Sequence, residues 1–331
     1  MKKIISTLSL LLVCIMLCSC SAFQVKNISV IATVNGEDIL LEEYNYFLLF
    51  AKQSILAGAN ATEDTKEFWT TTDIDGKNAA DLAKENALEE VVKYTLIAQK
   101  AKEMGISMDT PEAKEQISSA LTNASDYMQQ YGLSKEIMTS ILEKFYLRSM
   151  LIQQEVANGT IDASEEYIKK IYEEKFRTIK HILFSLTDPE TGETIYNETQ
   201  VYDSAKQAIE VINSGEQTFD EIMNAYSMDP GITSAPNGYT FTNDGSMVAP
   251  FEETAFALEI GEMSEPVMTS YGCHILKREP LLSFEEYVEN NDPSTITSII
   301  EEAYFTKLIA ELQSQGTIER NDKVFGKVDL Y

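Results

Sequence analysis

Hydrophobic and polar positions divide the chain into two helical flanks and a mixed centre. Apolar residues recur three and four positions apart through most of residues 41–175, and again in residues 283–313. Between these flanks, residues 176–280 alternate short aliphatic runs with further helical patterns. Spacing of three and four marks the buried face of a helix, and short aliphatic runs mark strands. The pattern therefore predicts a mostly helical protein that contains one compact α+β segment.

The first flank is predicted to open with a hairpin and to continue as helices. Val30–Val34 and Glu37–Leu40 surround Asn35-Gly36, the strongest dipeptide signal for a two-residue hairpin turn. Helical spacing and capping residues then predict helices over about 41–57, 79–104, 111–131, 134–158 and 165–175. Residues 58–78 are polar and are predicted to form a loop. Trp69, the only tryptophan, is expected to pin this loop onto the core rather than to serve as an exposed binding aromatic.

The mixed centre is predicted to form a strand, three helices, a strand, a helix and two strands. Lys180–Phe184 and Tyr271–Lys277 are rich in aliphatic residues and predict its first and last strands. The only two histidines of the chain, His181 and His274, lie in these two runs.

The second flank predicts helices over 284–289 and 296–313 and a strand over 323–330, where apolar and polar residues alternate. A helix and a strand at the far end of the chain need a surface on which to bury their apolar faces. The helical flank before residue 176 is the available partner. We therefore expect the mixed centre to be an insertion into a single helical domain.

Charge and cysteine content narrow the environment of the protein. Hydrophobic residues make up 44% of the 331 residues, enough for real cores, while the formal net charge is −27. So acidic a surface repels nucleic acid and anionic lipid. It can attract basic unfolded chains, or its charge can serve solubility alone. Cys273 is the only cysteine after residue 20, so we expect no internal disulfide in the exported part of the chain.

The N-terminus has the pattern of an export signal. Lys2 and Lys3 precede an apolar run, Ile4–Leu17, which is too short to span a bilayer but suits a signal-peptide core. The run ends in Leu17-Cys18-Ser19-Cys20, which resembles a bacterial lipobox. This resemblance implies that Cys20 becomes the lipidated first residue of the mature protein. The alternative is an ordinary cleaved signal peptide with an incidental cysteine.

Several motifs of the mixed centre follow the order found in one enzyme family. They are, in chain order, Lys180–Phe184, Phe219–Asp229, Met247–Phe251, Ala255–Leu258, Gly261–Val267 and Tyr271–Lys277. This order resembles the parvulin family of peptidyl-prolyl cis/trans isomerases. In addition, Val34–Ile39 followed by Glu42–Tyr44 is similar to the start of the chaperone domain of SurA-like and PrsA-like foldases.

These resemblances imply an α+β fold with two domains. A mostly helical, SurA N-terminal-like chaperone domain would hold an inserted parvulin domain of FKBP-like α+β type. The expected segments are a lipoprotein signal peptide (1–20), a tether (21–29), the first part of the chaperone domain (30–175), the parvulin domain (176–280), and a helix and strand that complete the chaperone domain (281–331).

The parvulin resemblance also assigns the active site. It places the polar catalytic centre at His181, Asp229 and His274. It further implies substrate-binding residues: an apolar wall that receives the proline ring and two polar positions before the second histidine. These are Met247 and Phe251 for the wall and Thr269 and Tyr271 for the polar positions.

Strand geometry supports a role for the two histidines without proving it. Alternation puts His181 on the face of Ile179 and His274 on the face of Leu276, so both side chains must find hydrogen-bond partners among apolar neighbours. They could be core histidines without function. With a carboxylate they could also bind zinc, but no close histidine spacing supports a metal site. We expect neither metal nor cofactor, and we expect Cys273, on the opposite face, to be a small buried residue.

The expected function is that of a lipid-anchored extracytoplasmic foldase. It would isomerise Xaa-Pro bonds in newly exported proteins and hold unfolded clients at the outer face of a bacterial cell membrane. Residues 185–204 contain no Lys or Arg, which disfavours phosphorylated substrates. The alternatives are a catalytically weak or inactive holdase with a scaffold parvulin domain, and a ligand-binding or structural surface lipoprotein. The sequence excludes nucleic acid as a partner and leaves a homodimer open.

Overall fold

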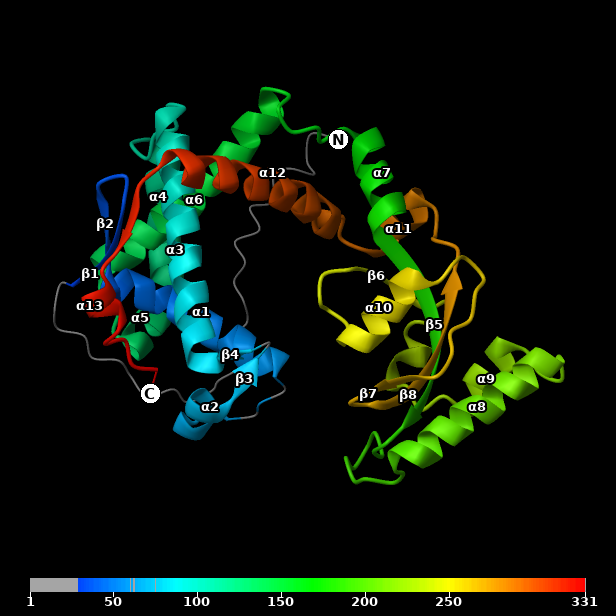
Figure 1. Ribbon diagram of the computed structural model, residues 1–331. Helices are drawn as coiled ribbons and strands as arrows, with labels where there is room; N and C mark the ends of the chain where they lie inside the picture. Colours follow the sequence, from blue (N-terminus) through cyan, green and yellow to red (C-terminus); the bar gives the residue numbers. More distant parts are fainter. Residues whose placement is uncertain (1–28, 60, 62, 75, 331) are drawn as a thin grey trace. The chain divides into compact units, whose positions relative to one another are not determined.

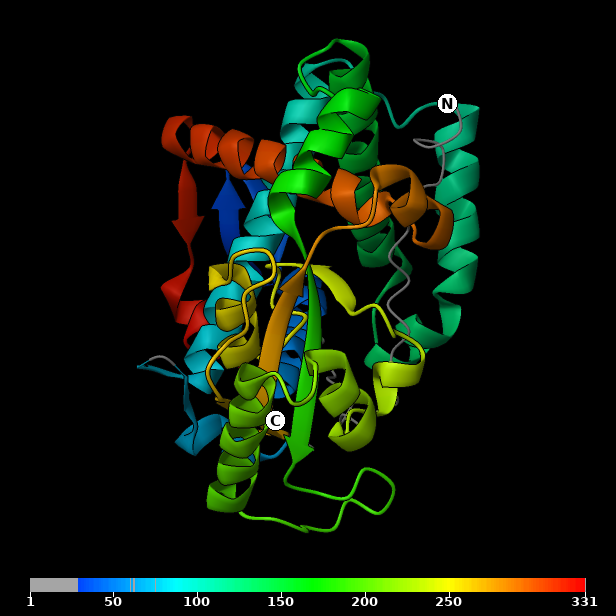
Figure 2. The same ribbon diagram turned by 90° about the vertical axis from the view of Figure 1, so that its right-hand side faces the viewer.

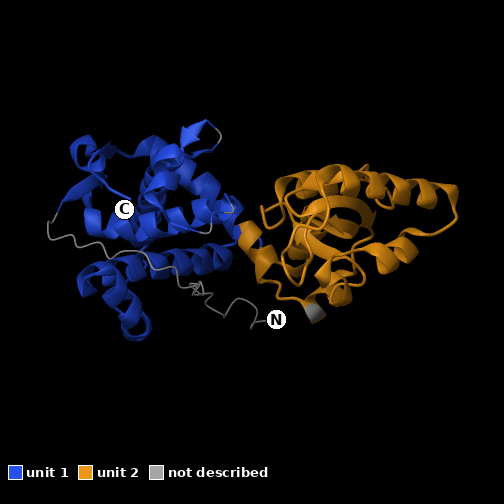
Figure 3. Ribbon diagram, turned by 90° about the horizontal axis from the view of Figure 1, so that it is seen from below, with its two compact units in different colours: residues 1–162, 301–331 blue, residues 163–300 orange. Residues whose placement is uncertain are grey.

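A computed structural model describes residues 29–330, apart from residues 60, 62 and 75. The chain separates into two compact units (Figure 3): residues up to 162 together with 301 onward form unit 1, and residues 163–300 form unit 2. The signal segment, Cys20 and most of the tether lie outside the described residues. Among the residues that are described, no helix has the length and apolar character needed to cross a membrane.

Unit 1 is mostly helical, with a small sheet at one end (Figure 1). Its elements before residue 162 are β1 (Val30–Val34), β2 (Glu37–Leu40), α1 (Leu41–Gly58), α2 (Lys66–Thr71), β3 (Asp73–Ile74), β4 (Lys77–Asn78), α3 (Ala79–Glu103), α4 (Pro111–Asn123), α5 (Ser125–Tyr131) and α6 (Lys135–Ala157). Local signals set several of these bounds. Asn35 and Gly36 take positive φ at the hairpin turn, and Ser134 caps α6 by accepting a hydrogen bond from the Ile137 N–H.

The C-terminal segment returns to the first strand of unit 1. After α12 (Ser294–Gln315) come β9 (Ile318–Arg320) and α13 (Asp322–Phe325), and β9 pairs antiparallel with β1 to give the sheet order β2-β1-β9. Phe305 on α12 is only 1% exposed, and its ring lies 4.3 Å from the Arg148 guanidinium carbon. The last residues of the chain are therefore part of the helical unit.

Three predicted elements of unit 1 are wrong in detail. The strand lies at 318–320 instead of 323–330, because the Asn321 side chain accepts from the Val324 N–H and starts a helical turn there. The loop predicted over 58–78 contains α2 and the β3–β4 hairpin. The helix predicted over 111–131 breaks at Ala124, and Tyr127 in its second half packs against Tyr46 of α1. Trp69 is fully buried, as expected for a residue that pins the segment onto the core.

Unit 2 is a four-stranded antiparallel sheet with helices on both faces (Figures 1 and 2). Its elements are α7 (Glu165–Lys175), β5 (Phe176–Ser185), α8 (Glu198–Ser214), α9 (Phe219–Tyr226), the 3₁₀ helix η1 (Pro230–Thr233), β6 (Tyr239–Thr242), α10 (Ala249–Ala257), β7 (Val267–Thr269), β8 (Gly272–Glu279) and α11 (Phe284–Asn290). The strand order is β6-β5-β8-β7. Between β5 and β8 this is the predicted succession of strands and helices.

Gly272 allows the end of β5 and the start of β8 to pair closely. It takes a φ of +148° and pairs with Ser185, and a Cβ at this position would lie 2.1 Å from the Phe184 carbonyl oxygen. Only glycine fits so close an approach of two backbones. The pairing continues from Gly272 to Glu279 and thereby fixes the positions of the two histidines on adjacent strands, with His181 opposite Leu276 and His274 opposite Leu183.

An aromatic cluster extends unit 2 beyond the predicted segment 176–280. Tyr172 of α7 lies 4.6 Å, between ring centroids, from Tyr287 of α11, and it also contacts Phe176 and Phe284. The Tyr172 hydroxyl donates to the Leu282 carbonyl oxygen at 3.2 Å. Helices α7 and α11 therefore pack with the sheet, which is why the compact unit runs from 163 to 300. The domain bounds 176 and 280 stay a prediction.

Candidate active site

Alternating residues of β5 and β8 face two different cores. Ile182 and Cys273 pack with Ile275 against α8 and α9, whereas Ile179 and Leu276 pack against α10. His181 pairs with Leu276 and His274 pairs with Leu183 across the two strands. Both histidines therefore lie on the α10 face, where strand alternation predicted them.

The two imidazoles contact each other directly. Their Nδ1 atoms are 3.1 Å apart, and the rings are nearly stacked, with centroids 5.2 Å apart. Both residues are less than 10% exposed. On the outer side of the pair, the Thr269 hydroxyl lies 2.9 Å from His274 Nε2.

Asp229 reaches the other end of the pair from the loop after α9. One carboxylate oxygen, Oδ2, lies 3.1 Å from His181 Nε2, and the other accepts a hydrogen bond from the Gly231 N–H. The loop is fastened to β5 because the Met228 N–H donates to the Leu183 carbonyl oxygen and the Leu183 N–H donates to Ser227 Oγ.

A fifth residue, Tyr239, completes the arrangement. Its hydroxyl donates to Asp229 Oδ2 at 2.7 Å, and its ring lies 5.6 Å from that of His181. Tyr239, Asp229, His181, His274 and Thr269 thus form one continuous chain of hydrogen bonds, which we call the network. The sequence did not mark Tyr239, because nothing in the pattern of β6 distinguishes it from other strand residues.

The surroundings fix the charge of two members of the network. Burial alone would raise the pKa of Asp229, but hydrogen bonds from His181, Tyr239 and the Gly231 N–H lower it to about 2. Burial, followed by the proximity of His181, lowers the pKa of His274 to about 4. At neutral pH Asp229 is therefore a carboxylate and His274 is uncharged.

One arrangement of protons satisfies every contact of the network when both imidazoles are neutral. The Asp229 carboxylate can only accept, so it takes hydrogen bonds from the Tyr239 hydroxyl and from His181 Nε2–H. His181 Nδ1 then accepts from His274 Nδ1–H, and His274 Nε2 accepts from the Thr269 hydroxyl. Because all donors point the same way along the network, a change at either end alters every hydrogen bond in it.

An apolar wall stands beside the network. Phe251 of α10 is 4% exposed, and its ring meets His181 and His274 edge-on, with centroid distances of 5.2 and 5.3 Å. Met247 is partly buried in the same cluster. Tyr271 is different, because its side chain is 58% exposed and its backbone N–H donates to Thr269 Oγ1. The structure therefore groups six of the seven predicted side chains and leaves the ring of Tyr271 at the surface.

The opposite face of the sheet carries Cys273, the neighbour of His274 on β8. Cys273 is fully buried, and burial raises the pKa of its thiol to about 11. A thiol in this state is a weak nucleophile. In the described part of the chain, no group of three or more His, Cys, Asp or Glu side chains is arranged to hold a metal ion.

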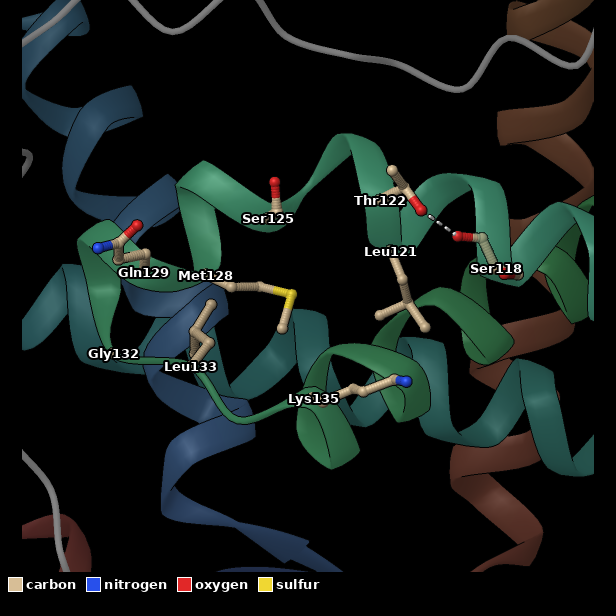
Figure 4. A pocket seen from close by; sticks show the side chains of 9 residues that line it. All are labelled: Ser118, Leu121, Thr122, Ser125, Met128, Gln129, Gly132, Leu133 and Lys135. Atoms are coloured by element: carbon tan, nitrogen blue, oxygen red, sulfur yellow. Dashed lines mark hydrogen bonds between the residues drawn. The ribbon is translucent and has the colours of Figure 1, made fainter.

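Unit 1 has a hollow of about 460 Å³ that contains none of the predicted site residues. It is lined by Ser118, Leu121, Thr122, Ser125, Met128, Gln129, Gly132, Leu133 and Lys135. Figure 4 shows Leu121 and Met128 pointing into the space between α4, α5 and the start of α6. The hollow thus has an apolar floor and a mainly polar rim.

Comparison with known proteins identifies both parts of the chain. Residues 181–280 match the PPIC-type PPIase domain, and residues 1–142 match the SurA-like N-terminal domain. Foldase protein PrsA of Caldanaerobacter subterraneus subsp. tengcongensis is 30% identical over 286 residues, covering 84% of this chain and 82% of that protein. The chain belongs to the PrsA foldase family.

A second curated relative agrees with this assignment. Foldase protein PrsA 4 of Bacillus cereus is 28% identical over 257 residues, which are 76% of this chain and 82% of that protein. The crystal structure of peptidylprolyl isomerase (PrsA) from Bacillus cereus is 22% identical, with a TM-score of 0.35, and covers 87% of this chain and 92% of that chain. As a PrsA-family member with a PPIC-type domain, the chain is an extracytoplasmic foldase and a peptidyl-prolyl cis/trans isomerase. The alternative of an inactive holdase is not favoured.

Proposed function

We propose that the network is the polar centre of the isomerase site and that Phe251 and Met247 receive the proline ring of the client. The observation that carries this proposal is the position of Phe251, whose ring touches both imidazoles. A proline held against Phe251 would place its preceding amide beside His181 and His274. His181, His274 and Asp229 are then the catalytic centre, with Thr269 supporting His274.

Isomerisation of an Xaa-Pro bond requires little more than this arrangement of side chains. An Xaa-Pro bond isomerises slowly because twisting it removes amide resonance, at a cost of about 20 kcal/mol. The twisted amide is less polar than the planar one, so a dry apolar wall favours it over the ground state. The network orients the site and sets its electric field, and no covalent intermediate is needed.

Substitution of Phe251 tests this proposal, with Phe256 as the matched control. Both phenylalanines lie on α10 and pack in the same cluster, but only Phe251 contacts the imidazoles. We expect Phe251→Ala to lower kcat/KM on an unphosphorylated Xaa-Pro peptide by about 100-fold, in keeping with the loss of a substrate-positioning contact. Phe256→Ala should stay within about threefold of the wild type, since it removes no such contact. Equal losses in the two variants would contradict the assigned pocket.

The clients that we propose are unfolded, newly exported proteins without phosphate near the proline. The loop between β5 and α8 bears Asp188, Glu190 and Glu193, and Asp188 accepts hydrogen bonds from the Glu190 and Thr191 N–H groups. These carboxylates would repel a phosphate. Peptides with phosphoserine before proline should therefore be turned over more slowly than the same peptides with serine or lysine.

We also propose that Cys20 carries the lipid anchor. Stable anchoring requires at least two acyl chains, because a single chain binds a membrane only marginally. Cys20→Ala should release the protein from the cell surface into the medium. Continued membrane association of that variant would contradict the proposal.

The hollow in unit 1 is the place where we propose that apolar side chains of an unfolded client bind. Leu121 and Met128 form its floor, as described above. Met128→Glu should weaken suppression of client aggregation and leave peptide isomerisation unchanged, because it places a charge in the apolar floor. Gln116→Glu adds the same charge at an exposed position of α4 and serves as the control. A homodimer stays a prediction, to be tested by sedimentation of the soluble protein.

A further inference from the structure

Tyr239 holds a position in the network that neither its strand pattern nor the family resemblance marks. We propose that the Tyr239 hydroxyl is a positioning group of the isomerase site, which holds Asp229 as a hydrogen-bond acceptor and thereby fixes the tautomers of His181 and His274. This inference rests on the function proposed above, because it concerns the same site. Tyr239 acts through Asp229 and need not touch the substrate amide.

The first observation is that two donors share one carboxylate oxygen. Asp229 Oδ2 accepts from the Tyr239 hydroxyl at 2.7 Å and faces His181 Nε2 at 3.1 Å, while Oδ1 accepts from the Gly231 N–H. Three hydrogen-bond donors around one carboxylate stabilise its charged form and keep the pKa of Asp229 low. His181 must then present Nε2–H to Asp229, and its Nδ1 becomes the acceptor for His274.

The second observation is that two glycines, Gly231 and Gly238, leave the space that the Tyr239 side chain and its strand occupy. A Cβ at Gly231 would lie 2.0 Å from the Tyr239 hydroxyl oxygen, although the φ of Gly231 is not positive, so glycine is needed there for space alone. At Gly238, just before the tyrosine, a Cβ would lie 2.7 Å from the Ile179 carbonyl oxygen. This close approach pairs Tyr239 with Ile179, two residues from His181 on β5.

The third observation is chemical. Burial, together with the hydrogen bond to Asp229, raises the pKa of Tyr239, so the phenol keeps its proton and remains a donor throughout the pH range of an assay. The titratable groups of the network are Asp229 from the η1 loop, His181 from β5, His274 from β8 and Tyr239 from β6. From α10 the network is contacted by Phe251, which does not titrate.

The network without the hydroxyl would have a second acceptable proton arrangement. Asp229 would lose one of its donors and would be easier to protonate. A protonated Asp229 can donate to His181 Nε2, after which His181 and His274 both reverse their tautomers and His274 Nε2–H points to Thr269. This second state holds one more proton, taken from solvent, so its share grows as the pH falls, and it lacks the field of the wild type.

The test is Tyr239→Phe, which removes one oxygen and keeps the ring. Because the chain has only two histidines, ¹⁵N-labelled histidine gives four ring-nitrogen signals that report both tautomers directly. In the wild type we expect protonated Nε2 on His181 and protonated Nδ1 on His274. In Tyr239→Phe we expect the shifts of both rings to move toward the reversed tautomers at a higher pH than in the wild type as the pH is lowered. We also expect a fall in kcat of about 3- to 10-fold, as for loss of one hydrogen bond to a charged group, with KM within about twofold. Tyr226→Phe, at an exposed tyrosine, is the control.

A second variant keeps the proposal testable if packing changes. Gly231→Ala should displace the hydroxyl from Asp229 and reproduce the effects of Tyr239→Phe. If both act through the same contact, the double variant Gly231→Ala/Tyr239→Phe should be no worse than Gly231→Ala alone. Additive losses, a loss confined to KM, or wild-type ¹⁵N shifts in Tyr239→Phe would each overturn the positioning role. A wild-type protein with the expected tautomers but no isomerase activity would instead refute the proposed active site.

Discussion

Both units bury polar side chains, but unit 1 buries opposite charges whereas unit 2 buries groups that share protons. In unit 1, Lys144 and Glu43 form an ion pair in which both side chains are about 5% exposed. Lys52 is equally buried; it pairs with Asp64 at 2.9 Å and donates to the Leu330 carbonyl oxygen. In unit 2 the buried polar groups include the two imidazoles of the network, which lie beside a half-buried carboxylate and phenol, and the buried carboxylate of Glu252, which accepts hydrogen bonds from the Gly245 N–H.

The difference shows what each kind of polar group contributes. A buried ion pair adds little net stability over apolar residues of the same shape, but it penalises any arrangement that separates its partners. In unit 1 one such pair joins α1 to α6 and another joins α1 to Asp64, just before α2, while a hydrogen bond from Lys52 joins α1 to the end of the chain. The network carries one charge, on Asp229, and otherwise consists of neutral groups, including imidazoles that can hold their proton on either ring nitrogen. Fixed charges therefore define the architecture of unit 1, and shared protons suit the chemistry of unit 2.

The largest effect is expected when one partner of the buried ion pair is removed. Lys144→Met leaves Glu43 charged and unpaired, which should lower the free energy of unfolding of unit 1 by about 3–5 kcal/mol. Trp69, the only tryptophan, lies in this unit, so urea unfolding followed by its fluorescence reports unit 1 alone. Glu43→Leu combined with Lys144→Met should recover most of the loss.

An exposed ion pair provides the control for this prediction. Lys77 and Glu85 are 2.9 Å apart, with side chains 59% and 49% exposed. Lys77→Met should cost at most about 1 kcal/mol, as exposed pairs generally do. If Lys144→Met proved no more destabilising than Lys77→Met, burial of the charges would not explain the difference between the units.

The second largest effect is expected in the stability of unit 2, which should depend on pH. The folded-state pKa of His274 is about 4, below its ordinary value of 6.5, so between these values the unfolded chain binds more protons than the folded one. Stability is therefore complete above about pH 6.5 and is lost as the pH falls toward 4, by on the order of 3 kcal/mol. Asp229, with a pKa of about 2, contributes a further loss only below its ordinary value of 3.8.

Amide hydrogen exchange in β5 and β8 measures this dependence in the full-length protein. Protection should fall between pH 6.5 and pH 4 after correction for the intrinsic exchange rate. His274→Asn removes the titrating ring and should flatten the profile over that interval. A profile that stays equally steep in His274→Asn would assign the effect to other groups.

The sequence predicted the elements whose bounds are set locally. The hairpin at Asn35-Gly36 and the start of α6 at Ser134 follow from turn and capping chemistry within a few residues. The final strand was misplaced because its position depends on pairing with β1, almost 300 residues earlier in the chain. Alternation over 323–330 was a weaker determinant than that pairing.

The same distinction applies to the site. Strand alternation predicted the apolar neighbours of His181 and of His274 on their own strands, and the family resemblance, not the pattern, pointed to Asp229 as their partner. Tyr239 was missed because its contact depends on the space left by Gly231 and on the pairing of β6 with β5. Neither of these is visible as a periodic pattern. The roles of the site residues stay proposals until the substitutions are made.

The smallest effect is expected at Cys273, the residue adjacent to His274 on the opposite face of β8. Its thiol is fully buried among Ile182 and Ile275, and its raised pKa of about 11 keeps it protonated at neutral pH. Cys273→Ser places a hydroxyl in this apolar core, which should cost about 1–2 kcal/mol of stability. It should nevertheless change kcat/KM by less than about twofold, whereas His274→Asn should lower it about 10-fold by interrupting the network. Peptide isomerisation measured on the two variants compares the two faces of one strand. A larger loss in Cys273→Ser than in His274→Asn would mean that packing of the α8 face, and not the network, controls turnover.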